Sequence, residues 1–278
     1  MLDERLGLRT SPINVQNLSA IDLRKCNVLI LPRAWQPELL AAVLREQVTE
    51  KIKRWMTGGG TLIGLGPSAA FLADEQRGLS AVRKRRDELD AYVEAVRRET
   101  DARSVTVDPQ IVWGGEPPSV GSDEPDGPEG EDAGAKPSER SDDSEALKRA
   151  DEWQRIFQPK GAIVAASVDH EHWLCFGLPD RLPVLIWGGY AYMSRHPVAT
   201  PVRLVDESHL RLSGLLWPEA RTRWAHTAYA TVERVGDGQV IPIATDPFFR
   251  GYFEGSGRLL ANTVILGPGM GTSQPLPW

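Results

Sequence analysis

Apolar and polar residues in the first third of the chain follow two periods, which predicts strands followed by helices. Residues 28–32 form a short, continuous apolar run, as expected for a strand covered on both faces. From Pro37 to Trp55 apolar positions recur every three or four residues, which predicts an amphipathic helix that a run of three glycines ends. A second buried strand is predicted over 61–66, and another helix after it. This order predicts a parallel sheet with helices on its faces.

The second half of the chain is richer in strand patterns. They lie at 161–168, 182–187, 202–204, 210–212, 228–235 and 239–244. The last two flank Gly236-Asp237-Gly238, a strong hairpin signal. A closing helix is predicted over 258–266, and the tail 268–278 is expected to be loose.

Acidic charge is concentrated in one segment. The formal charge is −6, but residues 116–145 contain eleven Asp/Glu and two Lys/Arg, a balance of 2 − 11 = −9, which leaves −6 + 9 = +3 for the rest. The segment is rich in Pro, Gly and Ser and has almost no apolar residues to offset its ordering entropy. We therefore expect 114–150 to be a disordered acidic insertion in a single domain spanning 1–278. A partner-binding acidic tail is the alternative interpretation.

A charged helix is predicted over 79–99, with four consecutive basic residues at 83–86. Phosphate or nucleic acid could meet this cluster. Because it is brief, lacks interleaved aromatic residues and precedes Asp87-Glu88, a solvated helix face is favoured, and no nucleic-acid partner is expected. No apolar run approaches the ~20 residues needed to cross a bilayer, so no membrane span is expected.

Asp246 and Arg250 follow a predicted strand, at the sheet edge where open α/β folds bind ligands. A bound carboxylate or phosphate could use Arg250 together with backbone amides around Ser256. The favoured alternative is an internal ion pair between Asp246 and Arg250, because neighbouring aromatic pairs look like core packing.

His170 and His172 form the only local histidine cluster of the sequence. On a strand the two imidazoles would share a face and could hold a metal with one more ligand. Surface or capping histidines are favoured instead, and no cofactor is expected. The two cysteines, Cys26 and Cys175, match no disulfide framework or compact metal-binding spacing, and we expect both to be small buried residues.

Several tracts, in their order along the chain, carry a resemblance to a known family. They are GGGTLIGLG, PKGAIV, DHEHWLCFGLP, LPVLIWGG, LSGLLWPE, GDGQV and DPFFRGYFEGSGRLLANTVILG. This order resembles the C-terminal domain of large bacterial zinc carboxypeptidases of the carboxypeptidase A-like family. The resemblance covers nearly the whole chain outside the acidic insertion. It implies an α/β class I glutamine amidotransferase-like fold, a three-layer α/β/α flavodoxin-like arrangement with a mostly parallel sheet.

The resemblance also implies where chemistry would be. Peptidase activity in that family belongs to a separate N-terminal domain with a His-x-x-Glu zinc pair, and no histidine of this chain has glutamate three residues later. Active amidotransferases need a cysteine on the tight turn after a strand and a histidine after a later strand. By resemblance these positions fall at 65–68 and 245–247, which contain neither. Ser68 is the substitute nucleophile, although Pro67 removes an amide donor and a helix N-cap role is favoured.

The expected function is a non-catalytic accessory domain associated with a zinc metallocarboxypeptidase. Its expected partner is that enzyme's catalytic domain, in the same or another polypeptide. The alternatives are a small-molecule module that binds a peptide or sugar ligand, and a hydrolase that uses Ser68. A secreted parent peptidase would place the domain in the periplasm or outside the cell, although MLDERLGLRTSP lacks a signal-peptide pattern.

Overall fold

The computed structural model describes residues 2–4, 6–34, 37–87 and 137–273, in two compact units. The first unit contains Met1–Asp87 and Asp151–Trp278, and the second contains Glu88–Ala150. Helix α6 (Pro137–Ile156) provides the described part of the second unit and the Asp151–Ile156 portion of the first. Within the segment expected to be disordered, 114–136 lie outside the described residues, whereas 137–150 are helical. Good helix formers in SEALKRADEW account for this difference.

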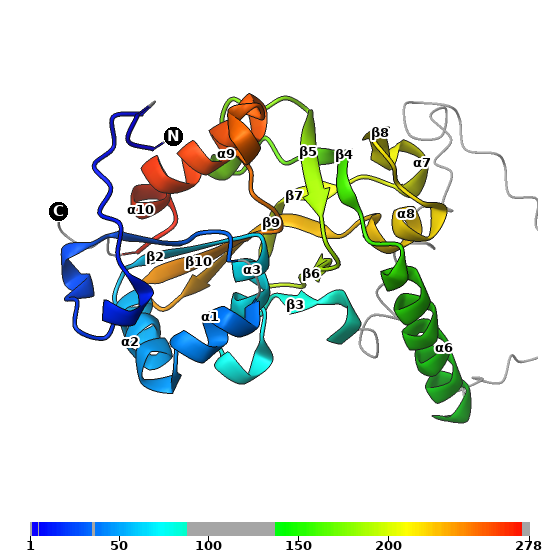
Figure 1. Cartoon of the computed structure of the whole chain (residues 1–278), viewed down its shortest axis with the longest axis horizontal. Coiled ribbons are helices and arrows are strands. Elements are labelled where there is room, and N and C mark those ends of the chain that lie inside the picture. Colours follow the sequence, from blue (N-terminus) through cyan, green and yellow to red (C-terminus); the bar gives the residue numbers. More distant parts are fainter. Residues whose placement is uncertain (1, 5, 35–36, 88–136, 274–278) are drawn as a thin grey trace, which may run out of the picture. The chain divides into compact units, whose positions relative to one another are not determined.

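A mixed sheet of ten strands organises the first unit (Figure 1). Its main path has the order β1-β2-β10-β9-β7-β4-β5. These strands are β1 (Val28–Leu31), β2 (Thr61–Leu65), β4 (Lys160–Val168), β5 (Arg181–Trp187), β7 (Ala199–Leu204), β9 (Ala228–Val235) and β10 (Gly238–Ile243). Three short strands join beside this path: β3 (Arg83–Lys84), β6 (Tyr192–Met193) and β8 (Arg211–Ser213).

The sheet differs from the mostly parallel one that was expected. β2 pairs in parallel with β1 and with β10, and the other pairings of the described strands are antiparallel. Helices connect β1 to β2, and such crossovers permit parallel pairing. Successive strands such as β4 and β5, or β9 and β10, have no long helix between them, which favours antiparallel pairing. The hairpin predicted at Gly236-Asp237-Gly238 is confirmed by the β9–β10 pair.

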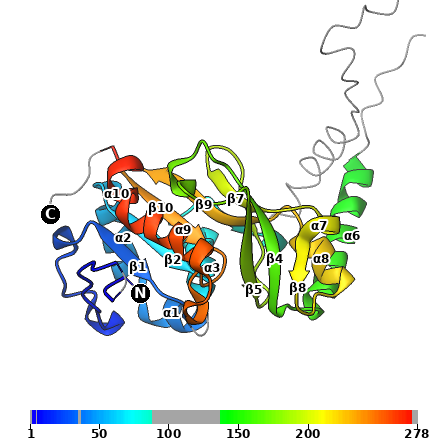
Figure 2. The same cartoon turned by 90° about the horizontal axis from the view of Figure 1, so that it is seen from above.

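The described helices of the first unit are α1 (Pro37–Val43), α2 (Glu46–Thr57), α3 (Pro67–Leu72), α7 (Glu207–Leu210), α8 (Pro218–Trp224), α9 (Glu254–Ile265) and α10 (Gly267–Met270). α7 and α8 lie near β4 and β8, whereas the other helices lie on both sides of β2 and β10. Figures 1 and 2 show α9 and α10 on one side of these strands and α1, α2 and α3 on the other. Among the described residues, no helix combines the length and apolarity needed to cross a membrane.

Three predicted helix boundaries are wrong. The helix predicted from Pro37 to Trp55 is broken into α1 and α2, because Arg45 adopts an extended conformation. The start of the predicted charged helix contains strand β3, which pairs with β6. The closing helix begins at Glu254, four residues before the predicted start.

Successive side chains of the central strands enter two different core clusters. Leu62 and Val240 pack in a cluster with residues of α2, whereas Ile63 and Ile241 pack in a cluster with Leu259 of α9. All five side chains are fully buried. A strand buried on both faces needs no polar alternation, which explains why 61–66 reads as one apolar run.

β2 ends in a sharp turn at Gly66, which has φ 58° and ψ −125°. Residues with a Cβ avoid this conformation. We expect Gly66→Ala to lower the free energy of unfolding by about 1–3 kcal/mol, measured by denaturant titration. Gly58→Ala is the control, because Gly58 has φ −86° and an added Cβ would make only ordinary contacts there. Equal losses for the two variants would contradict the role of the Gly66 conformation.

Candidate functional site

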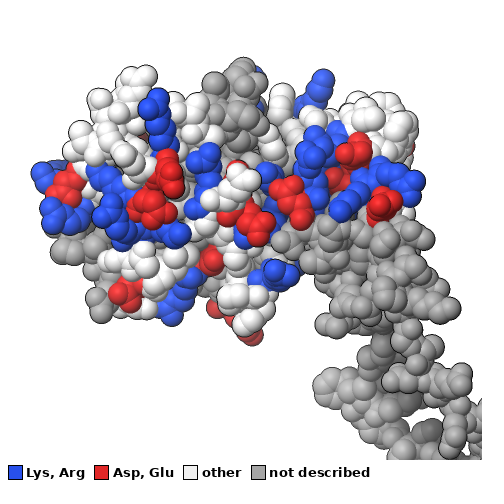
Figure 3. Space-filling model, turned by 90° about the horizontal axis from the view of Figure 1, so that it is seen from below, with Lys and Arg blue, Asp and Glu red and all other residues white. Residues whose placement is uncertain are grey.

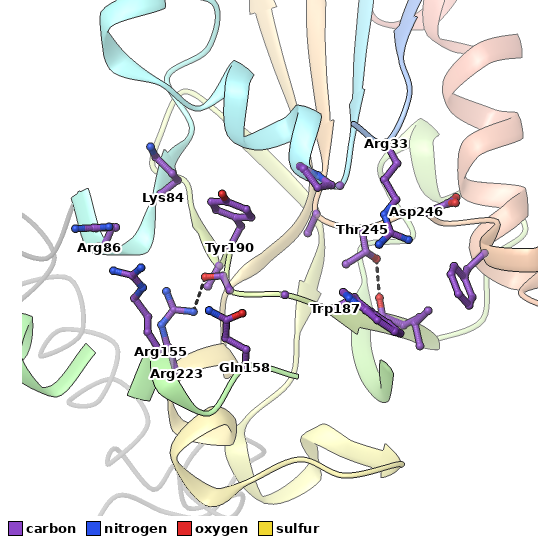
Figure 4. Close-up of a pocket in the computed structure, with 18 residues that line it drawn as sticks. Arg33, Lys84, Arg86, Arg155, Gln158, Trp187, Tyr190, Arg223, Thr245 and Asp246 are labelled. Carbon is purple, nitrogen blue, oxygen red and sulfur yellow. Dashed lines mark hydrogen bonds between the residues drawn. The ribbon is translucent and has the colours of Figure 1, made fainter. Parts of the chain in front are cut away.

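The carboxyl ends of the three parallel strands border one cavity of about 600 Å³ (Figure 4). Arg33 follows β1, Gly66 and Pro67 follow β2, and 244–246 follow β10, and all of them line the cavity. Ligands in open α/β sheets bind outside the carboxyl ends of such strands. The volume falls in the range of roughly 300–1,000 Å³ that is typical of small-molecule sites.

The opposite wall comes from the antiparallel half of the first unit. It is formed by the end of β5 and the loop after it, by residues at and after the end of α6, by β3 and its neighbourhood, and by α8. The residues of this wall are Lys84, Arg86, Arg155, Gln158, Leu185, Trp187, Gly188, Gly189, Tyr190, Ala191 and Arg223. The cavity therefore combines strand ends of the parallel part with loops of the antiparallel part.

Basic side chains dominate the lining of this cavity. Five lining residues are basic and one, Asp246, is acidic; the basic ones are Arg33, Lys84, Arg86, Arg155 and Arg223. On the face drawn in Figure 3, Lys and Arg are interspersed with Asp and Glu. Clefts lined by charges of one sign concentrate ligands of the opposite sign. The lining thus favours an anion.

Not all of these cations are equally available to a ligand. The ammonium group of Lys84 lies 3.2 Å from Asp87, and Nε of Arg86 lies 3.8 Å from the same carboxylate. Within the described part of the chain, neither Arg33 nor Arg155 forms an ion pair with an acidic side chain. These two guanidinium groups are the most accessible to an anionic ligand.

A buried ion pair holds one side of the cavity. Nε of Arg223 donates a 2.9 Å hydrogen bond to Asp151, and its Nη1 donates a 2.8 Å bond to the carbonyl oxygen of Gly189, which lines the cavity. Asp151 and Arg223 are only 2% and 3% exposed, and Nε of Arg85 lies 3.5 Å from Asp151. Burial lowers the pKa of Arg223, and Asp151 opposes this effect. The pair therefore fixes the 188–189 loop in place.

The floor of the cavity is fixed by hydrogen bonds of Thr245. Its hydroxyl donates a 2.6 Å bond to the carbonyl oxygen of Leu185 and lies 3.1 Å from the hydroxyl of Tyr229. Because the Thr245 proton is used in the first bond, Tyr229 donates the second. Burial raises the pKa of Tyr229 well above its usual value, which keeps this hydroxyl protonated as the donor. The strand end of β10 is thereby attached to β5.

The part of the cavity around Trp187 is aromatic. Trp187 is 47% exposed although it lines the cavity. The guanidinium of Arg33 lies 5.9 Å from the centre of the Trp187 ring, within the range of a cation–π contact. The ring of Phe249 lies 6.3 Å from that of Trp187. These contacts position Arg33 without a carboxylate partner.

The turn after β2 has the backbone of a catalytic elbow but lacks its side chain. In α/β hydrolases a nucleophile occupies the sharp strand-to-helix turn, and here that position is Gly66. Ser68 is fully buried inside the first turn of α3; its hydroxyl donates to the carbonyl oxygen of Pro32 and accepts from the amide of Ala34. The predicted N-cap role of Ser68 is wrong, because Gly66 is the N-cap residue of α3.

The structure separates the three ligand-binding candidates near the chain's end. Asp246 lines the cavity, and its Oδ1 accepts a 3.0 Å bond from the amide of Phe248. Arg250 is exposed, is not among the lining residues, and lies with its guanidinium 5.3 Å from the Phe249 ring. Ser256 is buried and donates a 2.6 Å bond to the carbonyl oxygen of Pro247. The expected ion pair between Asp246 and Arg250 is not formed.

The two histidines have separate structural partners. His170 and His172 lie in the turn after β4, so the argument that they share a strand face was wrong. Nε2 of His170 lies 2.8 Å from Asp180, whereas Nδ1 of His172 accepts the amide of Leu174 and caps the short helix η4 (Trp173–Cys175). The capping prediction is thus confirmed for His172, and burial lowers its pKa.

The described residues contain no cluster of three or more His, Cys, Asp or Glu side chains that could hold a metal. Of the cysteines, Cys175 is buried as expected, and burial raises the pKa of its thiol to about 11. Cys26 is partly exposed.

The basic and aromatic side chains that line the cavity were not predicted from the sequence. Arg33 could have been predicted as a site residue, because it follows a predicted buried strand just as Asp246 does. Both residues lie at the carboxyl edge of the sheet. Arg155 and Trp187 gave no local signal. Trp187 reaches the cavity through the antiparallel pairing of β5 with β4, and Arg155 reaches it through the position of helix α6; a local sequence pattern specifies neither.

The comparisons with known proteins identify no relative: no family model, no curated protein and no solved structure matches this chain. The resemblance to the carboxypeptidase-associated domain therefore stays a prediction.

Proposed function

We propose that this chain is a non-catalytic domain that binds a small anionic ligand in the cavity at the carboxyl ends of β1, β2 and β10. The observation that carries the proposal is the lining of five basic side chains and one acidic one. Arg33 and Arg155 have no acidic partner among the described residues, so their charges are available to a ligand. Guanidinium groups bind carboxylates and phosphates through paired hydrogen bonds, which supports this class of ligand.

The absence of catalysis is part of the proposal. Gly66 occupies the elbow where a nucleophile would stand, and Pro67 offers no amide proton for an oxyanion hole. The Ser68 hydroxyl is buried and donates its proton to a backbone oxygen, away from a ligand in the cavity. These observations favour binding over the hydrolase alternative.

The family to which the chain belongs is also part of the proposal. We propose a three-layer, flavodoxin-like relative of the class I glutamine amidotransferase fold that serves as an accessory domain of a zinc metallocarboxypeptidase. Helices on both sides of β2 and β10, and the sharp turn at Gly66, support this assignment. A carboxypeptidase acts on peptides that end in a carboxylate, a group that suits a basic cavity. If the catalytic domain belongs to the same polypeptide, the reading frame upstream of this chain should encode a His-x-x-Glu zinc domain, and its absence there would refute that form of the accessory role.

Binding is tested by thermal unfolding in the presence of citrate, glucose 6-phosphate and an N-acetylated dipeptide, each paired with an uncharged analogue. At least one anion should raise the Tm, because a ligand at 100 times its Kd stabilises the folded state by about 2.7 kcal/mol. Arg155→Met should weaken that binding at least about tenfold, as one hydrogen bond to a charged group contributes roughly 1.5–3 kcal/mol.

Arg181→Met is the matched control. Arg181 is exposed and lies outside the cavity lining. Stabilisation by the uncharged analogues alone, or equal binding by the Arg155→Met protein and the wild type, would refute the proposed site.

A further inference from the structure

The cavity is polarised, with excess positive charge at one end only. Figure 4 shows Arg86, Arg155 and Arg223 gathered at one end, whereas Arg33, Trp187 and Asp246 lie at the other. All six residues line the same cavity. The two ends therefore offer different chemistry to different parts of one ligand.

Among the described residues, four lining cations at the first end, Lys84, Arg86, Arg155 and Arg223, are contacted by two carboxylates, those of Asp87 and Asp151. The buried carboxylate of Asp151 faces two guanidinium groups, those of Arg223 at 2.9 Å and Arg85 at 3.5 Å. Burial lowers the pKa of Arg223, and the nearby positive charges of Arg85 and Arg155 lower it further. Because Arg155 is itself partly buried, solvent screens this excess less than it would on an open surface. An anionic group at this end would remove the imbalance.

The second end is close to neutral and presents an aromatic surface. Arg33 and Asp246 contribute one charge of each sign, and Trp187 is half-exposed beside them. The face of an indole ring is electron-rich and packs well against C–H bonds that carry partial positive charge. The free carboxylate oxygen of Asp246 can accept bonds from hydroxyl groups, and Arg33 can donate to them.

We infer that the ligand has one anionic group, bound at the Arg155 end, joined to a neutral, hydroxyl-bearing ring that packs on Trp187, as in a sugar phosphate or a sugar acid. This inference rests on the proposed anion-binding function and specifies its ligand class. A molecule of this kind also suits a cavity of about 600 Å³. Arg155 holds the anionic group, and Asp246 and Arg33 orient the hydroxyl groups.

The test is calorimetric titration with four probes: glucose 6-phosphate, glucuronate, inorganic phosphate and N-acetylglycylglycine. The last carries a carboxylate on a flexible chain without a ring. One of the two sugar anions should bind at least about tenfold more tightly than either probe without a ring, since each ring-specific contact is lost in those probes. Which sugar anion binds more tightly distinguishes a phosphate from a carboxylate as the anionic group.

Two variants separate the two ends. Trp187→Leu should reduce the affinity for the sugar anion to that for inorganic phosphate and leave the phosphate affinity unchanged, which also shows that the variant is folded. Arg155→Met should weaken both. If phosphate binds as tightly as the sugar anions, or if Trp187→Leu leaves sugar-anion binding intact, the ring-bearing ligand is refuted while anion binding stands. If no anion binds, the proposed function itself fails.

Discussion

Replacing Arg223 with methionine is expected to lower the free energy of unfolding by about 3–5 kcal/mol, the cost of removing one partner of a buried ion pair. Arg223 is the closer of the two guanidinium groups that contact Asp151, whose carboxylate is 2% exposed. Oδ2 of Asp151 already lacks a hydrogen-bond partner among the described residues, so the carboxylate has little to replace the lost bond. The variant also frees the carbonyl oxygen of Gly189, so ligand binding should weaken with stability.

Urea unfolding followed by circular dichroism measures this loss. Arg181→Met, at an exposed position, should change the free energy of unfolding by no more than about 0.5 kcal/mol. The double variant Arg223→Met with Asp151→Leu should recover part of the loss, because replacing a whole buried pair by apolar residues is often neutral. A double variant less stable than Arg223→Met alone would contradict the interpretation.

Gly238→Ala is expected to destabilise the protein by about 3 kcal/mol or more, at the upper end of the cost of overpacking. A Cβ at this position would lie 2.0 Å from the carbonyl oxygen of Met56 and 2.3 Å from that of Gly60. Both obstacles are backbone atoms, so no side-chain rotation can relieve the clash. Relief requires β10 to move away from the end of α2, and the amide of Gln239 would lose its 3.1 Å bond to Gly60.

Gly269→Ala is the matched control for this substitution. An added Cβ at Gly269 meets no atom within 4 Å, so its stability should change little. Thermal unfolding of the two variants side by side provides the comparison. A Gly238→Ala protein as stable as Gly269→Ala would contradict the close packing of β10 against α2.

Local patterns predicted the positions of the long strands in both halves of the chain, but not the antiparallel pairing of the strands in the second half. The apolar runs at 28–32 and 61–66 became β1 and β2; β2 is buried on both faces, whereas Val28 and Ile30 of β1 are only partly buried. The hairpin at 236–238 could also be predicted from local sequence, because Gly and Asp residues between two strand patterns favour a tight turn. The pairing of strands that are not consecutive in the sequence, such as β7 with β9, leaves no comparable pattern in the sequence.

The residues of the candidate site also divide into those that a local pattern could predict and those whose position depends on long-range packing. Asp246 could be assigned to the carboxyl edge of the sheet because it directly follows a strand, and it lines the cavity. Arg250 could not be excluded from the site by its sequence, since no local pattern indicates that it is exposed and has a positive φ of 51°. Arg155 could not be predicted as a site residue. It lies in the last turn of a helix that begins in the acidic segment, and its position in the cavity depends on long-range packing.

The central claim is that the cavity at the ends of β1, β2 and β10 binds a small anion through its basic side chains. Calorimetric titration of citrate into the wild type and into the Arg33→Met, Arg155→Met double variant tests it most directly. We expect one-site binding to the wild type that weakens as salt is added, and at least about tenfold weaker binding to the double variant. Equal affinity for the two proteins, or a wild-type affinity that does not respond to salt, would contradict the claim.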